Sequence, residues 1–232
     1  MGSILLFLSV LAIIGAWWLS RQGLTSKPWL EQGTTGVLPE ANATPPSRIG
    51  LGIFLAVVGS LFARFFSAYA MRMQLPDWRT LPIPAILWLN TAMLVLSSLA
   101  LHGANRAVRR GEMPELRMGL LAAGISALAF LSGQLLAWRQ LTGEGYLLAA
   151  NPANAFFYVL TGVHGLHLLG GLVALGRTTE KAWCETTTEP LRLSVELCAT
   201  YWHFLLLIWL VFLSVLTGWA GEFVDICRQL LT

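Results

Sequence analysis

Long apolar stretches alternate with short polar connections along the whole chain. A helix that crosses a bilayer needs about 20 mostly apolar residues. On that criterion the sequence predicts about six crossings, at roughly 3–20, 49–70, 84–105, 117–138, 154–176 and 195–218. The connections leave no room for a separate soluble domain. The pattern therefore predicts an all-α integral membrane protein, a bundle of about six transmembrane helices.

One connection differs from the others because it is rich in proline, glycine and threonine. It covers residues 25–48. We expect an N-terminal transmembrane anchor at 1–24, this linker on the cytoplasmic side, a five-helix body at 49–220 and a short periplasmic tail at 221–232. The first apolar stretch lacks a basic n-region and ends in paired tryptophans, which suits a retained anchor better than a cleaved signal peptide.

Composition and charge agree with a membrane location. Hydrophobic residues make up 56% of the chain and charged residues 12%, far fewer charges than in a soluble domain. The connections after the first, third and fifth predicted helices hold ten Lys and Arg residues, against four on the other side. Because these residues stay preferentially on the cytoplasmic side, both termini are expected to face the periplasm. The net charge of +3 follows from this asymmetry and does not call for a nucleic-acid partner.

Three of the four histidines lie inside the last two predicted helices. His164 and His167 are about 60° apart on one helix face, and His203 lies in the following helix. Polar groups in hydrocarbon need partners, so the residues alone favour a hydrogen bond from each histidine to a neighbouring helix. The alternative is axial ligation of haem by His164 or His167 with His203, as in a membrane electron carrier.

Glycines and cysteines in the same region carry two smaller expectations. The glycines of the fifth predicted helix that share the face opposite the histidines predict a close packing seam; they are Gly162, Gly165 and Gly176. The cysteines have neither CxxC nor zinc-type spacing, so no metal site is expected on them; they are Cys184, Cys198 and Cys227.

Five motifs, in order along residues 47–218, resemble the helices of cytochrome c oxidase subunit III. The stretch 156–167 is similar to that family's penultimate helix, and Tyr201 to Phe204 followed by Trp209 is similar to its last helix. Earlier helices carry further likenesses, which are Phe66 to Tyr69, Asn90-Thr91 with Ser97-Ser98, and Gln134 to Arg139 followed by Asn151-Pro152.

The resemblance implies a supporting subunit of a proton-translocating haem-copper oxidase in a bacterial inner (plasma) membrane. Oxidase subunits I and II, a small subunit IV and phospholipids are the partners it implies. Haem and copper are expected in the partner subunits, with no cofactor, metal or catalytic residue in this chain. An accessory subunit of a nitric oxide reductase is the alternative with the same helices.

Eight residues are the candidates for structural or lipid contacts within that reading. They are Arg64, Asn90, Gln134, Arg139, His164, His167, Trp202 and His203. Arg64 lies about seven residues, roughly 10 Å at 1.5 Å per residue, before the outer end of its predicted helix, from where it can reach the interface.

The chain departs from the family at buried acidic positions. Val57 and Val58 stand where better-known members carry a serine and a membrane-buried glutamate. Ala137 and Leu206 replace two further acids in the elements 134–138 and 202–206. Any role of those carboxylates cannot be transferred to this chain, and Glu196 is the acid expected closest to a span.

Overall fold

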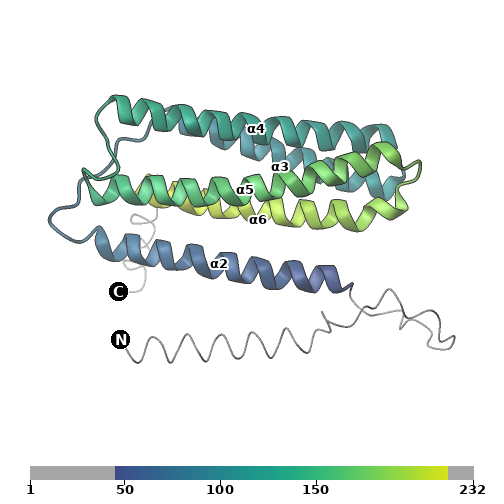
Figure 1. Cartoon of the computed structure of the whole chain (residues 1–232), viewed down its shortest axis with the longest axis horizontal. Helices are drawn as coiled ribbons and strands as arrows, with labels where there is room; N and C mark the ends of the chain where they lie inside the picture. The colour runs from purple at the N-terminus through teal and green to yellow at the C-terminus, as the bar shows by residue number, and fades with distance from the viewer. Residues whose placement is uncertain (1–44, 219–232) are drawn as a thin grey trace, which may run out of the picture. The chain divides into compact units, whose positions relative to one another are not determined.

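The computed structural model describes residues 45–218, and every regular element in that range is helical (Figure 1). The elements are α2 (Pro46–Arg72), α3 (Ile86–Arg110), α4 (Met113–Gly143), α5 (Pro152–Cys184), the short 3₁₀ turn η2 (Glu189–Leu191) and α6 (Arg192–Leu216). Five helical stretches in the described range are long and apolar enough to cross a membrane. The predicted all-α membrane fold is confirmed there. The expected anchor at 1–24, most of the linker and the tail at 221–232 lie outside the described residues.

Successive helices run in opposite directions, so their termini gather at two ends of the bundle (Figure 1). We call the end where α2, α4 and α6 begin and α3 and α5 finish the basic end. Its basic residues are Arg48, Arg106, Arg109, Arg110, Arg117, Arg177, Lys181 and Arg192. The opposite end carries Arg72, Arg79 and Arg139 within the described range.

Local signals set where the helices begin and end. α2 begins at Pro46, so the last residues of the expected linker are already helical; proline suits a first turn because its missing N–H would have no partner there. The side chain of Asn151 accepts a hydrogen bond from Ala153 N at the start of α5. α3 is followed by its cap residue Gly111, whose φ of 82° is left-handed, a conformation that glycine adopts without strain.

α3 has a large buried face in the described bundle. It packs against both α4 and α6, and its buried side chains include Asn90, Thr91, Ser97 and Ser98. The contact with α4 is close because small residues meet: a Cβ added at Gly119 would lie 2.9 Å from the Cβ of Ala104. Small residues let helix backbones approach in a membrane, where burial of apolar surface gives little driving force.

α2 lies at the edge of the bundle, against α5 and α6 (Figure 1). Its buried residues are Val58, Phe62 and Tyr69. Its other large apolar side chains, including Ile49, Ile53, Phe54, Val57 and Leu61, are exposed. An apolar surface of this kind is compatible with lipid or with another membrane protein.

Candidate functional site

A hydrogen-bonded path through buried side chains links α6, α3 and α4. The indole N–H of Trp202 donates to Ser97 Oγ at 2.7 Å, and Ser97 Oγ donates to the backbone oxygen of Ala123 at 2.8 Å. Trp202 and Ser97 are both fully buried. Each polar atom in this path therefore has a partner, which is the condition for placing it away from water. We call this arrangement, indole to hydroxyl to carbonyl, an indole relay.

Two more indole relays occur in the described bundle. Trp209 Nε1 donates to Thr91 Oγ1 at 3.0 Å, and Thr91 donates to the carbonyl four residues earlier in α3 at 2.8 Å. Trp138 Nε1 donates to Thr161 Oγ1 at 3.0 Å, and Thr161 donates to the carbonyl four residues earlier in α5 at 2.7 Å. The relays fix α6 to α3 and α4 to α5.

His164 is buried on α5, and neither of its ring nitrogens has a hydrogen-bond partner. Its ring is enclosed by aromatic rings from three other helices, with centroid distances of 6.4 Å to Phe62, 5.8 Å to Phe130 and 5.3 Å to Trp209. The expected hydrogen bond to a neighbouring helix is therefore absent at His164. Aromatic packing surrounds the imidazole instead.

The two other histidines differ from each other. His167 Nδ1 lies 2.8 Å from the backbone oxygen of Val163, so its ring bonds within α5 and not to a neighbouring helix, which corrects the expectation for this residue. His203 Nδ1 bonds to the hydroxyl of Ser98 on α3, and its ring lies 5.9 Å from the ring of His102. Only His203 makes the expected cross-helix bond among the three. Because His164 and His203 face different neighbours, this arrangement does not favour haem ligation between them.

The glycine seam is only partly as expected. A Cβ at Gly162 or Gly165 would meet Trp138 or Leu131 of α4 at ordinary van der Waals distances, and one at Gly176 would meet nothing within 4 Å. Besides Gly119, two tight glycines are Gly133, where a Cβ would collide with the amide of Asn90, and Gly171, where it would lie 2.7 Å from the ring of Tyr201. Sequence reasoning missed both, although each lies one helix turn or less from a motif residue.

Asn90 and Gln134 form a buried amide pair between α3 and α4. Asn90 Nδ2 donates to Gln134 Oε1 at 3.4 Å, and both side chains are buried. The absence of a side chain at Gly133 gives Asn90 the space to approach. Gln134 Nε2 has no partner among the described residues. The pair thus places one unused donor at a helix contact.

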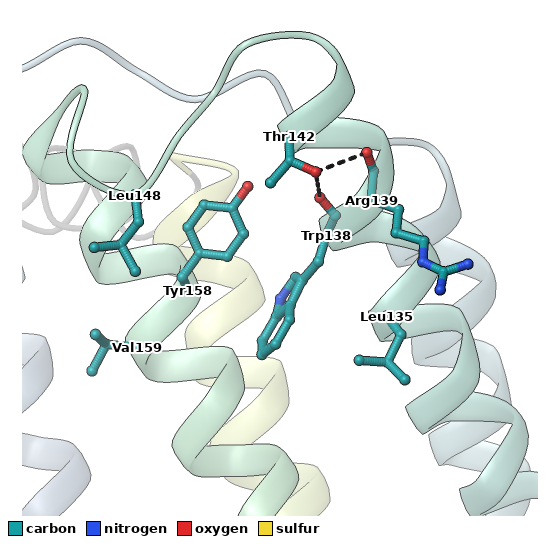
Figure 2. Close-up of a pocket in the computed structure, with 7 residues that line it drawn as sticks. All are labelled: Leu135, Trp138, Arg139, Thr142, Leu148, Tyr158 and Val159. Carbon is teal, nitrogen blue, oxygen red and sulfur yellow. Dashed lines mark hydrogen bonds between the residues drawn. The ribbon is translucent and has the colours of Figure 1, made fainter.

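An apolar groove separates α4 from α5 towards the opposite end (Figure 2). It has a volume of about 520 Å³ and is lined by Tyr158 and Trp138, whose rings pack edge to face with centroids 5.8 Å apart, with Arg139 at its rim. Figure 2 shows the guanidinium of Arg139 directed away from Tyr158. A second hollow of about 430 Å³ shares Leu135 and Trp138 with the first and extends further along α5 to Gly165. We refer to both hollows together as the α4–α5 groove.

Acidic residues lie near the helix ends in the described part of the chain. Glu196, one turn into α6, pairs with Arg48 of α2 at 2.8 Å. Val58, at the position of the family's glutamate, is only 3% exposed, whereas the neighbouring Val57 is 61% exposed. Val58 therefore occupies a site inside the bundle and not a lipid-facing one. Arg64 is exposed on α2, eight residues before its last residue.

No group of three or more His, Cys, Asp and Glu side chains is placed to hold a metal ion within residues 45–218. Cys184 is exposed and Cys198 is buried, with its sulfur 3.5 Å from Thr178 Oγ1. Asn90, Gln134, Trp202 and His203 make hydrogen bonds between helices, and His164 is held by aromatic contacts.

Known proteins are similar in sequence to this chain over most of its length. The family model described as "Cytochrome c oxidase subunit III" matches residues 45–221. Cytochrome c oxidase subunit 3 of Thermostichus vulcanus is 30% identical over 194 residues, covering 80% of this chain and 94% of that protein. The subunit 3 of a Synechocystis strain is 29% identical over 171 residues, covering 70% and 71%.

A further relative is the probable cytochrome c oxidase subunit 3 of Mycobacterium tuberculosis, 28% identical over 165 residues, which cover 70% of this chain and 80% of that protein. These relatives do not favour the nitric oxide reductase or electron-carrier alternatives. The matched region begins where α2 begins and contains the indole relays, the histidines and the α4–α5 groove. The chain therefore belongs to the cytochrome c oxidase subunit III family and is a subunit III of a haem-copper oxidase, a family without redox centres of its own.

Proposed function

We propose that this chain is the lateral supporting subunit of a bacterial terminal oxidase and that it holds phospholipid in the α4–α5 groove. It packs within the inner membrane beside subunits I and II, with a small subunit IV as a further neighbour. Those partners carry haem and copper, and the whole complex transfers electrons to O2 and translocates protons. The polar side chains of this chain serve helix packing, as the indole relays illustrate.

The observation that carries the lipid proposal is the chemistry of the groove. Its lining is mostly apolar, from Leu135 and Trp138 on one side to Val159 on the other, and a permanently charged Arg139 lies at its rim. An acyl chain fits the apolar lining, and an arginine near a helix end can reach a phosphate in the headgroup region. Arg64, exposed near the same end of α2, is proposed to make a similar interfacial contact.

Partner identity is tested by purifying the chain from its native membrane under mild detergent. Subunits I and II are expected to accompany it in equal amounts, together with the visible spectrum of haem. Recovery of the chain alone, or with an unrelated transporter, would reject the proposed partnership.

Lipid retention is tested by Arg139→Gln, with Arg79→Gln as the matched control at the same end of the bundle. The first variant is expected to reduce the phospholipid counted per purified complex, and the control to leave it unchanged, because Arg79 does not line the groove. Arg64→Leu is expected to lower lipid retention or subunit attachment while the chain still inserts. Equal lipid content in all of these preparations would contradict the lipid role.

The orientation proposal places the basic end in the cytoplasm and both termini in the periplasm. Cys184 is an exposed thiol at the basic end. In a Cys227→Ser background, a membrane-impermeant maleimide should modify Cys184 in inverted vesicles and not in intact spheroplasts. The reverse pattern would invert the topology.

A further inference from the structure

A second hollow of different chemistry lies at the basic end, where α2 and α6 begin and α3 finishes. It has a volume of about 540 Å³, and its polar lining consists of Arg48, Asn105, Arg109, Arg192 and Glu196. We call it the arginine pocket. It lies at the end of the helix bundle away from the rim of the α4–α5 groove, so nothing in the preceding proposal accounts for it.

Positive charge is in excess in the arginine pocket. Three guanidinium groups share the pocket with one carboxylate. That carboxylate, Glu196, is bound to Arg48 at 2.8 Å. Arg192 donates to the backbone oxygen of Arg109 at 3.4 Å, and neither of these two arginines has an ion-pair partner among the described residues. The residues that line the pocket therefore carry two more positive than negative charges, on side chains that never lose their proton.

The N-terminus of α2 adds to the same field. α2 begins at Pro46 beside the pocket, and no side chain caps its first turn. The N-terminal end of a helix carries a partial positive charge, which favours an anion. The arginines supply the specific donors, and this helix end reinforces them.

Asn105 gives the pocket a second kind of contact. Its Oδ1 is buried and has no hydrogen-bond partner. A buried acceptor left unpaired is costly, so a ligand that also brings a hydroxyl donor would satisfy it. An anion with both features is a phosphate with a hydroxyl on it or beside it, as in hydrogen phosphate or a glycerol phosphate diester.

We propose that the arginine pocket binds such a phosphate group, with Arg109 and Arg192 as its principal donors and Asn105 as the acceptor for its hydroxyl. Arg48 has a different task, because its bond to Glu196 fastens α2 to α6. The phosphate can come from an anionic lipid headgroup or from a free anion in the cytoplasm, and the experiment separates these sources.

The test uses the full chain with whatever subunits accompany it, in the wild type and in the double variant Arg109→Gln/Arg192→Gln. Arg110→Gln is the matched control, because Arg110 lies at the same end but outside the pocket. Arg48 is left intact so that α2 stays attached. Two readouts are taken: phosphatidylglycerol retained per chain by mass spectrometry, and the shift of the thermal midpoint with added inorganic phosphate, with matched chloride as the ionic-strength control.

Loss of about one retained phosphatidylglycerol per chain in the double variant alone would support the site and assign the phosphate to a lipid. A phosphate-dependent rise of the midpoint that weakens about tenfold in apparent affinity in the double variant, the scale of one lost charge-assisted hydrogen bond, would support the site and assign it to a free anion. Asn105→Leu should weaken binding of whichever ligand the double variant loses, phosphatidylglycerol or inorganic phosphate. If the double variant and the Arg110→Gln control match the wild type in both readouts, the proposal is overturned.

Discussion

α2 and α3 belong to the same bundle but differ in opposite directions in hydropathy and in burial. The most apolar stretch of α2 has a mean hydropathy of 2.1, against 1.5 for α3. Yet α2 buries three residues in the described chain, and α3 buries ten, four of them Asn, Thr or Ser. In lipid, apolar side chains gain little by leaving the bilayer, so the polar and small residues of α3, and not its hydropathy, indicate its larger buried face.

The largest expected effect comes from adding a side chain where α3 and α4 pack most closely. Gly133→Ala places a methyl group against the Asn90 amide. We expect a loss of about 1–3 kcal/mol in folding free energy from overpacking, seen as a lower thermal midpoint of the purified chain. Gly103→Ala is the control on α3 because a Cβ there meets nothing within 4 Å. Equal midpoints for both variants would show that α3 and α4 are not tightly fitted.

A neighbouring pair of valines tests how α2 is attached. Val58→Ala removes buried atoms and should lower stability by about 1 kcal/mol, whereas Val57→Ala alters an exposed side chain and should change the isolated chain little. Both variants are to be measured by thermal unfolding with and without partner subunits. If Val57→Ala destabilises only the assembled complex, the exposed face of α2 is an interface. If both are neutral everywhere, Val58 does not contribute to the attachment of α2.

A double-mutant cycle measures one indole relay on the α3 side of the comparison. Trp202→Phe, Ser97→Ala and the combined variant should reveal a coupling of about 0.6 kcal/mol, the average for hydrogen bonds between membrane helices. The readout is the free energy of unfolding in detergent or bicelles. If the two single-variant changes in the free energy of unfolding add up to that of the double variant, the buried hydrogen bond makes no net contribution to stability.

The smallest expected effect is the absence of carbodiimide modification on α2. A hydrophobic carbodiimide needs a carboxyl group within the membrane, and no acid occurs in α2. Little or no modification is expected at the depth of Val58 by peptide mapping. Val57→Glu, which adds an acid at an exposed position, is the positive control and should be modified. Modification of Glu196 in the wild type would instead show that its ion pair with Arg48 opens within the membrane.

Hydropathy predicted the crossings within residues 45–218 well because each is a continuous apolar run. It predicted their ends less well: α4 continues to Gly143 and α5 to Cys184, beyond the predicted 117–138 and 154–176. Those extra turns contain charged and polar residues beyond the apolar run. Hydropathy cannot predict that the helix continues there. Helix-ending signals such as Gly111 are present in the sequence, but a hydropathy scan does not detect them.

The polar contacts were harder to foresee than the crossings. Asn90, Gln134 and Trp202 could be chosen as contact residues because a polar group inside an apolar run needs a partner. Which partner each finds depends on helix rotation, so the bond of Trp202 to Ser97 and the aromatic enclosure of His164 were not predictable. The arginine pocket was also hidden, since its residues come from three helices far apart in sequence.

The indole relays have a consequence for protons. An indole N–H can only donate and a backbone carbonyl can only accept, with a single hydroxyl between them. Trp202, Ser97 and the carbonyl of Ala123 therefore form a chain whose two ends are chemically closed. A proton hop along it would have to begin by removing hydrogen from an indole and end on an amide oxygen. The Trp202 relay thus binds three helices through polar contacts and offers no route for proton transfer between them.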